Sequence, residues 1–381
     1  MLRRLRRRTA HGGRSRRRGD LFVRARAGRH SRGCEGARLA RRRRVRRRRR
    51  SRSPRAGGPR PLRRSRARAR GRRHPSRGHP APRASARAGR GLTIATFGAR
   101  DVPLAPHTSL RIGGPADFFL RVATEKDLLG AIQVARENEL PVFVLGGGTN
   151  LLVADRGIRG VVLQNAFRES SVDGEIVTAS SGTELAHVAA VAARSGIEGL
   201  EWMATVPGTV GGAVHGNAGA FGSETADVLV NAELVDMNGD RWTAKVEELG
   251  YAYRTSTLQG TPIVCVRARF RGRGGDRANA VKRIKEMANE RIKKQPLAQP
   301  NTGSIFRNPP GDFAGRLIEA AGLKGRAIGG AMVSPKHANF IVNANGATAS
   351  DVHALMTLVQ REVAKRFNVK LVPEVELVGE W

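Results

Sequence analysis

The sequence predicts a mixed α+β fold for residues 92–381, and three observations support this prediction. Segments whose apolar residues recur at helical spacing alternate with short apolar runs that are typical of buried strands. Turn signals that contain glycine and asparagine separate these segments. The stretch is also long enough to form two or three packed units, each with its own apolar core.

The positive charge of the chain is concentrated before this predicted fold. The whole sequence has a formal net charge of +37, from 69 Lys and Arg against 32 Asp and Glu. Residues 1–90 hold 37 arginines, no lysine and two acids, so the remainder is nearly neutral. A near-neutral domain lacks the broad electrostatic footprint that binds a phosphate backbone. We therefore expect no nucleic-acid partner for the folded part.

Residues 1–91 are expected to be a disordered, arginine-rich extension, because repulsion among so many guanidinium groups opposes collapse. One alternative is a nucleic-acid-binding arm, for which RRRRVRRRRR at 41–50 is the natural evidence. Another is an organelle transit peptide, although the amphipathic spacing of such peptides is missing. The composition favours a mis-called start in GC-rich DNA, because lysine is absent here while ten lysines follow. On that interpretation the protein begins near residues 91–102.

The apolar pattern and the cysteines point to a cytoplasmic protein. No run approaches the roughly 18 to 20 apolar residues that cross a bilayer, so we expect no membrane association. The only cysteines, Cys34 and Cys265, cannot by themselves form a disulfide framework or a zinc site. We expect no metal.

The first part of the predicted fold alternates helix and strand. Residues 124–140 begin with capping-box spacing and place apolar residues on one face, which predicts a helix. PVFVL at 141–145 predicts a buried strand, and RGVVLQN at 159–165 predicts another. Residues 184–196 predict an amphipathic helix that ends at Gly196.

The second part is richer in strands and ends in helices. We expect an irregular glycine-rich stretch at 204–223 and strand pairs within 229–270. A basic helix is predicted at 276–294, and a later helix is predicted to have Ser350 as its N-cap. The predicted apolar face of the basic helix consists of Val281, Ile284, Ala288 and Ile292.

Two glycine-rich segments suggest a phosphate-containing ligand. VLGGGTNLLV at 144–153 allows successive backbone N–H groups to converge, which would suit a diphosphate, although a plain tight turn is the alternative. It does not match the P-loop or the Rossmann pattern, and no helix follows it. The many glycines within 204–224 imply close backbone approach to something flat or bulky, for which a large dinucleotide cofactor is the economical explanation.

Three polar residues stand out in later segments. Arg254 lies in YRTS, where an ordinary surface ion pair is the alternative to a functional role. Ser304 follows a glycine but lacks the G-x-S-x-G elbow, which disfavours a hydrolase nucleophile. Glu374 and Glu376 alternate with apolar residues as in a strand, so one of them should face inward.

Seven motifs, taken in order, resemble the UDP-N-acetylenolpyruvoylglucosamine reductase (UDP-N-acetylmuramate dehydrogenase) family. The resemblance covers about 95–381, without the inserted tyrosine segment that some members carry, and the arginine-rich extension has no counterpart. The motifs are HTSLRIGGPADF (107–118), VLGGGTNLLV (144–153), GTVGGAVHGNAGAFG (208–222), YRTS (253–256), GSIFRNP (303–309), AGRLIEAAGLKGRAIGGAMVSPKHANFIVN (314–343) and PEVELVG (373–379).

The resemblance implies an FAD-binding domain of the vanillyl-alcohol-oxidase and p-cresol-methylhydroxylase type in two lobes, 92–166 and 167–275. A C-terminal α+β substrate domain follows at 276–381. It also implies the NADPH-dependent, FAD-mediated reduction of UDP-N-acetylglucosamine enolpyruvate to UDP-N-acetylmuramate in peptidoglycan biosynthesis. The partners would be this small-molecule substrate and NADPH, and we expect a monomer.

The resemblance also implies the site residues. Arg254, Ser304 and Glu374 match the family's catalytic positions. The positions that match FAD-contacting segments are Gly146, Gly147, Gly148, Thr149, Asn150, Gly208, Gly211, Gly212, Asn217 and Gly219. The candidates for holding the UDP diphosphate or the carboxylate are Arg307, Asn308, Lys336 and His337. His107 and Thr302 depart from residues common in the family, and both departures concern packing.

Two other functions stay open on the residues alone. One is a sugar or aldonolactone oxidase of the same fold, which would use oxygen but would lack the joint presence of YRTS, GSIF and PEV. The other is a nucleic-acid-binding protein that acts through its arginine-rich arm, which predicts salt-dependent binding and colourless preparations.

Overall fold

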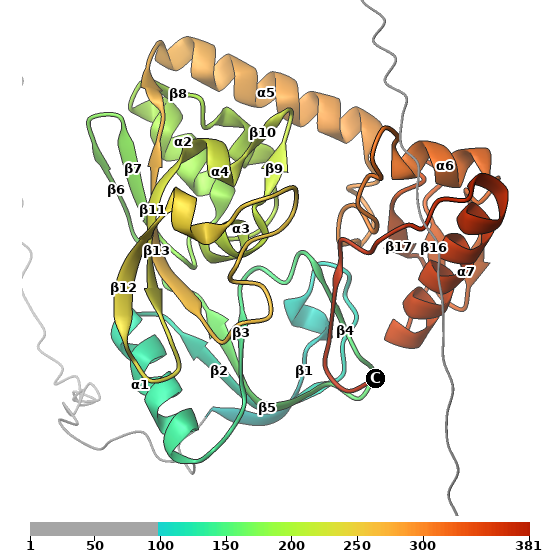
Figure 1. Ribbon diagram of the computed structural model, residues 1–381, viewed down its shortest axis with the longest axis horizontal. Coiled ribbons are helices and arrows are strands. Elements are labelled where there is room, and N and C mark those ends of the chain that lie inside the picture. Colours follow the sequence, from blue (N-terminus) through green and yellow to red (C-terminus); the bar gives the residue numbers. More distant parts are fainter. Residues whose placement is uncertain (1–97) are drawn as a thin grey trace, which may run out of the picture. The chain divides into compact units, whose positions relative to one another are not determined.

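The structure is a computed structural model that describes residues 98–381 (Figure 1). The predictions of a disordered extension and of a mis-called start concern residues 1–91, which lie outside the described residues. Within residues 98–381 the predicted α+β fold is confirmed, since helices and sheets are mixed along the chain. None of the helices described there is long and apolar enough to span a membrane.

The first lobe is a four-stranded sheet in the order β1-β2-β5-β3. Its strands are β1 (Ala99–Pro103), β2 (Pro115–Val122), β3 (Val142–Leu145) and β5 (Ile158–Asn165). β1 is antiparallel to β2, whereas β2 and β3 both run parallel to β5. Helix α1 (Glu125–Glu137) packs on one face of this sheet, with Leu128 and Ile132 in a shared apolar core. Thr124 caps it through the predicted capping box with Asp127.

The second lobe is a five-stranded antiparallel sheet in the order β12-β11-β13-β7-β6. Its strands are β6 (Ser170–Asp173), β7 (Ile176–Ser180), β11 (Leu229–Val235), β12 (Arg241–Lys245) and β13 (Val264–Arg271). Helices α2 (Leu185–Arg194) and α3 (Val210–Gly216) supply apolar side chains to its core, which includes the buried Trp202 and Phe270. The predicted helix at 184–196 is therefore confirmed as α2.

The glycine-rich stretch is more regular than predicted. It contains α3 and part of a short hairpin rather than irregular chain throughout. Glycine is a poor helix former, so the local sequence disfavours α3, and burial of Val210 and Val214 stabilises it instead. The remaining short elements of this lobe are β8 (Ile197–Glu198), β9 (Gly219–Ala220), β10 (Ser223–Glu224), β14 (Arg273–Gly274), α4 (Thr225–Val228) and the 3₁₀ turns η3 (Glu201–Thr205) and η4 (Val246–Leu249).

Helix α5 (Arg277–Lys294) packs on the second lobe, although it was predicted to begin the C-terminal domain. Ala280, Ile284 and Met287 lie against the core that α2 and η3 share, and Figure 1 shows α5 running past α2 and β8. The predicted face was therefore wrong in part, because Ile292 is 56% exposed.

The C-terminal domain is a small α+β unit. It comprises α6 (Ala314–Ala320), α7 (Ala349–Phe367) and a sheet of β15 (Ala327–Ile328), β16 (Ala331–Val333) and β17 (Ile341–Asn343). Thr348, not the predicted Ser350, caps α7 through a capping box with Asp351. Ser350 is the second residue of the helix, and its N–H and hydroxyl groups both donate to Asp155 of the first lobe.

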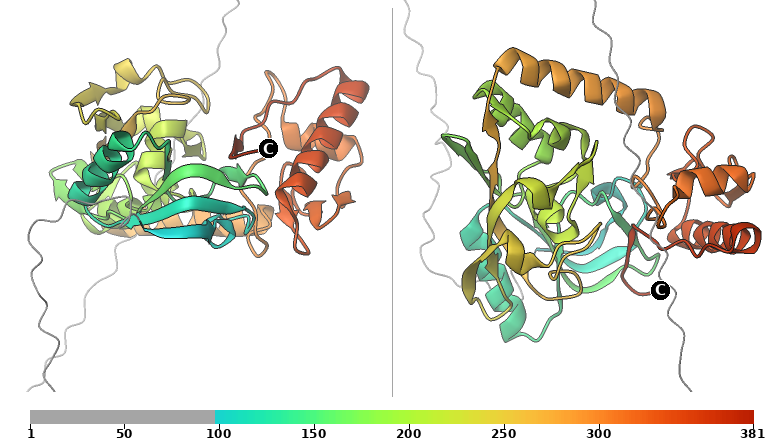
Figure 2. Two further views of the ribbon diagram at one scale, coloured as in Figure 1. Left: turned by 90° about the horizontal axis from the view of Figure 1, so that it is seen from below. Right: turned by 45° about the horizontal axis from the view of Figure 1, so that its top comes forward.

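The last strand returns to the first lobe. β18 (Glu376–Val378) pairs in parallel with β4 (Leu151–Val153), which follows the glycine-rich loop. The first lobe also contains the 3₁₀ turn η2 (Ala105–His107). The red C-terminal segment in Figures 1 and 2 runs back from the C-terminal helices toward β4. Asn150 is fixed at this junction, because its carbonyl accepts from the Glu376 N–H and its amide donates to the Glu374 carbonyl.

Candidate active site

Residues from distant parts of the chain line one cavity of about 880 Å³. Arg254, Ser304 and Glu374 all contribute to its wall. The residues from the predicted FAD-contacting segments that also line it are Gly146, Gly147, Gly148, Thr149, Asn150, Gly208, Gly211, Gly212 and Gly219. The fold thus brings both glycine-rich segments next to the three polar residues that the family resemblance singles out.

Arg254 is held in one orientation by hydrogen bonds from all three guanidinium nitrogens. Nε donates to Glu374 Oε1 at 2.8 Å, Nη1 to the Asn217 carbonyl at 3.3 Å and Nη2 to the Gly219 carbonyl at 2.7 Å. Its backbone has φ of 59°, a left-handed conformation that non-glycine residues rarely adopt. This fork of donors therefore has a fixed position at the cavity wall, at some cost in backbone strain.

Glu374 faces inward and Glu376 faces solvent. A continuous strand would place both residues on one face, but β18 begins only at Glu376, so Glu374 turns inward before the strand starts. The Glu374 side chain is only 17% exposed. Burial raises the pKa of its carboxyl group, and the positive charges of Arg254 and Arg307 oppose that effect without cancelling it. The carboxyl group is therefore easier to protonate than an ordinary glutamate.

Ser304 presents a hydroxyl group that no other side chain or carbonyl within residues 98–381 binds. It follows Gly303, whose φ of 80° makes the turn into the cavity wall. Asn339 fixes the next residues, since its carbonyl accepts from the Ile305 N–H and its side chain makes two hydrogen bonds with the backbone of Phe306. The serine is thus rigidly placed while its hydroxyl stays available.

Asn217 does not line the cavity, although it belongs to a segment that the resemblance assigns to FAD contact. It is fully buried and adopts φ of 46° as the C-cap of α3. Its amide donates to the Ala252 carbonyl at 3.0 Å and its oxygen accepts from the Ala226 N–H at 3.0 Å. These contacts connect α3 to the segment that carries Arg254.

The glycine-rich walls fit a bound dinucleotide. A Cβ atom on Gly212 would meet only Thr209 Oγ1, at 3.8 Å, and one on Gly216 would meet nothing within 4 Å. These glycines therefore leave open space at the cavity wall, into which a ligand can come close to the backbone. The N–H groups of Gly147, Gly148 and Thr149 donate to no other group within residues 98–381, which leaves them free for phosphate oxygens.

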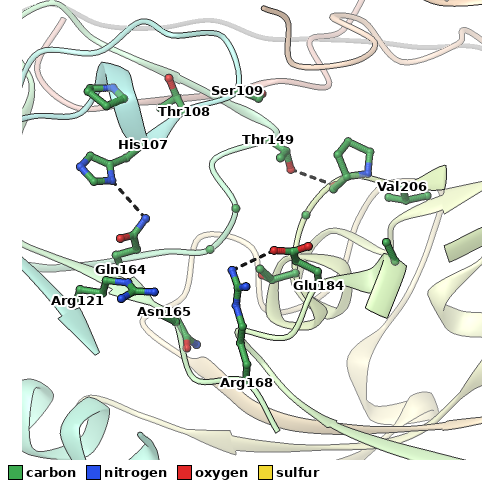
Figure 3. Close-up of a pocket in the computed structure, with 18 of the residues that line it drawn as sticks. His107, Thr108, Ser109, Arg121, Thr149, Gln164, Asn165, Arg168, Glu184 and Val206 are labelled. Carbon is green, nitrogen blue, oxygen red and sulfur yellow. Dashed lines mark hydrogen bonds and ion pairs between the residues drawn. The ribbon is translucent and has the colours of Figure 1, made fainter. Parts of the chain in front are cut away.

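A second cavity of about 650 Å³ shares the wall formed by Gly146, Gly147 and Thr149 with the first. Figure 3 shows Arg168 and Glu184 at its side, joined by an ion pair of 3.0 Å, and Thr149 donating to the Pro207 carbonyl. The two adjoining cavities together offer room for a molecule with two ring systems and a diphosphate.

His107 lines this second cavity. Its ring lies 4.4 Å from that of Phe119, and the side chains of Gln164 and His107 form a hydrogen bond of 3.3 Å (Figure 3). Burial lowers the pKa of His107. Packing with Phe119 agrees with the structural role expected for it.

The residues suggested for the diphosphate or carboxylate separate into two groups. Arg307 lines the larger cavity, whereas Asn308, Lys336 and His337 do not. Asn308 accepts from the backbone at the start of α6, and Lys336 donates to the carbonyl of Ile292.

Two cations at the end of α5, Arg291 and Lys294, line the larger cavity but were not among the predicted site residues. The basic end of the predicted helix was a visible signal, but it is also typical of an ordinary helix C-terminus. Within residues 98–381 no cluster of three or more His, Cys, Asp or Glu is arranged to hold a metal ion.

Family models match both parts of the described fold. Residues 116–245 match an FAD binding domain, and residues 295–378 match the UDP-N-acetylenolpyruvoylglucosamine reductase C-terminal domain. The second match starts just after α5, consistent with the packing of that helix on the second lobe.

Curated proteins and a solved structure show the same likeness along nearly their whole length. UDP-N-acetylenolpyruvoylglucosamine reductase 2 of Symbiobacterium thermophilum is 45% identical over 282 residues, which cover 74% of this chain and 92% of that protein. The reductase of Rubrobacter xylanophilus is 46% identical over 283 residues, covering 74% and 95%. The crystal structure of the Thermus caldophilus reductase matches with a TM-score of 0.63 at 36% identity, covering 73% and 98%. The chain therefore belongs to the UDP-N-acetylenolpyruvoylglucosamine reductase family.

Proposed function

We infer that this chain reduces UDP-N-acetylglucosamine enolpyruvate to UDP-N-acetylmuramate, with FAD as cofactor and NADPH as hydride donor, in peptidoglycan biosynthesis. The observation that carries this conclusion is the meeting of Arg254, Ser304 and Glu374 beside the glycine-rich walls of one cavity. FAD, when bound, relays a hydride from NADPH to the substrate. The free N–H groups of Gly147, Gly148 and Thr149 would hold its diphosphate.

The reaction needs a hydride at the terminal carbon of the enolpyruvyl group and a proton at the adjacent carbon. Arrival of the hydride at the terminal carbon breaks the carbon–carbon π bond and moves its electron pair to the adjacent carbon and into the attached carboxylate. The product is an enediolate, which is effectively a dianion. Arg254 stabilises that developing charge, and its hydrogen bonds to two carbonyls keep it in place before the charge forms. A preorganised cation of this kind lowers the barrier more than it strengthens ground-state binding.

Ser304 is the proposed proton donor. A serine hydroxyl is a weak acid in water, but an enolate is basic enough to take its proton, and neighbouring cations lower the cost of the alkoxide that remains. Its hydroxyl lines the cavity and has no competing partner within residues 98–381.

Glu374 is proposed to hydrogen-bond the enol and to hold Arg254. The raised pKa of its carboxyl group and its contact with Arg254 Nε support this role, because the group can exchange a proton near the reacting carbon while one oxygen stays fixed.

The wall charges suit an anionic nucleotide sugar. Arg254, Arg291, Lys294 and Arg307 line the cavity, whereas Glu290, Glu374 and Glu376 are its acidic residues. The excess of cations favours a substrate that carries a diphosphate and a carboxylate.

Spectroscopy and turnover of the purified full-length protein test the function. We expect a yellow protein that oxidises NADPH only when UDP-N-acetylglucosamine enolpyruvate is present and that forms UDP-N-acetylmuramate. A colourless protein, or NADPH oxidation by oxygen at the same rate without the enolpyruvyl substrate, would contradict the proposal. A monomeric state, a cytoplasmic location and the absence of nucleic-acid and membrane partners stay predictions.

A further inference from the structure

The Arg307 side chain lines the larger cavity without a partner. Its Nε atom is buried and makes no hydrogen bond, and its guanidinium forms no ion pair within residues 98–381. A buried donor of a charged group that lacks an acceptor costs free energy on folding. The other guanidinium donors make no hydrogen bond within residues 98–381 either, so the side chain is available to bind a ligand in the cavity.

The other cations of the cavity are already engaged. Arg254, Arg291 and Lys294 each donate a hydrogen bond to a side chain of the protein. Among the cations that line this cavity in residues 98–381, Arg307 alone has a side chain that makes no hydrogen bond and no ion pair. The positive charge of the guanidinium selects an anionic acceptor, and its planar fork of donors suits a carboxylate or a phosphate.

The position of Arg307 distinguishes these two anions. Its N–H donates to the Val372 carbonyl at 2.9 Å, and the Glu374 N–H donates to the Ile305 carbonyl at 2.8 Å. Arg307 therefore follows Ser304 on a segment that runs beside Glu374. Its charge lowers the pKa of Glu374, although burial has the larger, opposite effect, so the two side chains lie within electrostatic reach.

The chemistry of the substrate then favours the carboxylate. In the enolpyruvyl group the carboxylate is bonded directly to the carbon that receives the proton. The diphosphate is attached at another position of the sugar ring, farther from the reacting carbons. An anion next to Ser304 and Glu374 is accordingly the carboxylate.

We propose that Arg307 binds the carboxylate of the enolpyruvyl group and thereby turns the reacting double bond toward Ser304. This inference rests on the proposed function. It separates two tasks, since Arg307 recognises the charge that the substrate already carries, while Arg254 stabilises the charge that the reaction creates.

Ligand titration of the oxidised, FAD-loaded full-length protein tests the assignment. Wild type, Arg307→Gln and Arg307→Lys are titrated with UDP-N-acetylglucosamine enolpyruvate and, separately, with UDP-N-acetylglucosamine, which lacks the carboxylate. The readouts are isothermal calorimetry and the change in flavin absorbance. Loss of a charge-assisted hydrogen bond should weaken the enolpyruvyl ligand by about tenfold to a hundredfold in Arg307→Gln. Arg307→Lys should lose less, because it keeps the charge but not the planar fork.

Binding of UDP-N-acetylglucosamine should be unchanged in both variants. Arg361→Gln, which removes an exposed arginine of α7, is the matched control and should change neither affinity. Equal weakening of both ligands would assign Arg307 to the diphosphate and overturn the inference, as would unchanged binding of both. Arg307→Lys preserves the test if Arg307→Gln does not fold. A wild-type protein that fails to reduce the enolpyruvyl substrate would instead overturn the proposed function.

Discussion

The Glu374 carboxylate accepts a hydrogen bond from Arg254 Nε at 2.8 Å, although the two residues lie 120 positions apart in the sequence. Arg254 comes from the segment after η4, and Glu374 comes from the chain that returns to β4. The contact thus joins the second lobe to the last segment of the protein across the cavity wall. It couples the protonation of a buried acid to the position of a cation.

Glu374→Gln should change the pH dependence of stability. The pKa of Glu374 is raised in the folded state above its ordinary value of 4.5, mainly by burial and against the charge of Arg254. The folded state therefore binds this proton more tightly than the unfolded state does. The stability that this group contributes is fully present below pH 4.5 and is lost as pH rises through the folded-state pKa. Denaturant unfolding across that window should show a smaller decrease with pH for Glu374→Gln than for wild type, and parallel curves would contradict the shift.

Ser304→Ala should separate the two half-reactions. Flavin reduction by NADPH should proceed at the wild-type rate, whereas reoxidation by the enolpyruvyl substrate should slow by roughly a hundredfold to ten-thousandfold, as expected for loss of a general acid. Stopped-flow absorbance of the flavin measures both steps. Ser195→Ala, at an exposed position outside both cavities, is the control. An equal loss in both half-reactions would show that Ser304 is structural.

Gly212→Ala should impair FAD binding without destabilising the protein. The added methyl group meets no protein atom closer than 3.8 Å, and alanine is favoured over glycine within a helix by about 1 kcal/mol. The apoprotein should therefore be as stable as wild type or more stable, while its FAD affinity falls. Thermal unfolding of the apoprotein and FAD fluorescence quenching report the two quantities. Unchanged FAD affinity would argue against an occupant beside Gly212.

Gly148→Ala, unlike Gly212→Ala, should destabilise the apoprotein, because the neighbouring backbone leaves no room for a Cβ atom. Gly148 has φ of 61°, and a Cβ would lie 2.2 Å from the His107 carbonyl oxygen. We expect the apoprotein to lose about 1 to 3 kcal/mol of stability. Wild-type stability in this variant would contradict the close approach of the two backbones.

Asn217→Gly should reduce turnover while FAD is retained. Glycine keeps the left-handed backbone of Asn217 but removes its hydrogen bond to Ala252, which braces the segment before Arg254, and its hydrogen bond to Ala226 of α4. We expect kcat to fall about tenfold or more through misplacement of Arg254, with little change in the FAD content measured by absorbance. Loss of FAD with normal turnover after FAD is added back would support the cofactor contact that the family resemblance implies.

Local features of the sequence predicted several elements correctly, and tertiary contacts decided the others. Thr124 and Asp127 specify the start of α1 through a capping box that involves only neighbouring residues. The prediction of the inner face of α5 was partly wrong, because the spacing of its apolar residues permits two overlapping stripes. Contact with α2 and η3 selects the stripe that contains Ala280 and Met287. Position along the chain cannot reveal such a choice.

The candidate site, too, could be predicted from the sequence only in part. The glycine-rich segments and the motifs around Arg254, Ser304 and Glu374 are visible in the sequence. The hydrogen bond from Arg254 to Glu374 is not visible there, because it depends on the return of the last segment to β4. Arg307 was one of several polar candidates until the structure showed which of them has unused donors at the cavity.

The parallel pairing of β18 with β4 has a consequence for the order of folding. The Asn150 amide is bonded to the Glu374 carbonyl 224 residues later, so the contact closes a very long loop. During synthesis the glycine-rich loop leaves the ribosome long before its final partner exists. The flavin site should therefore be completed only after translation of residues 374–378, and a nascent chain arrested at residue 340 should bind FAD more weakly than the released protein.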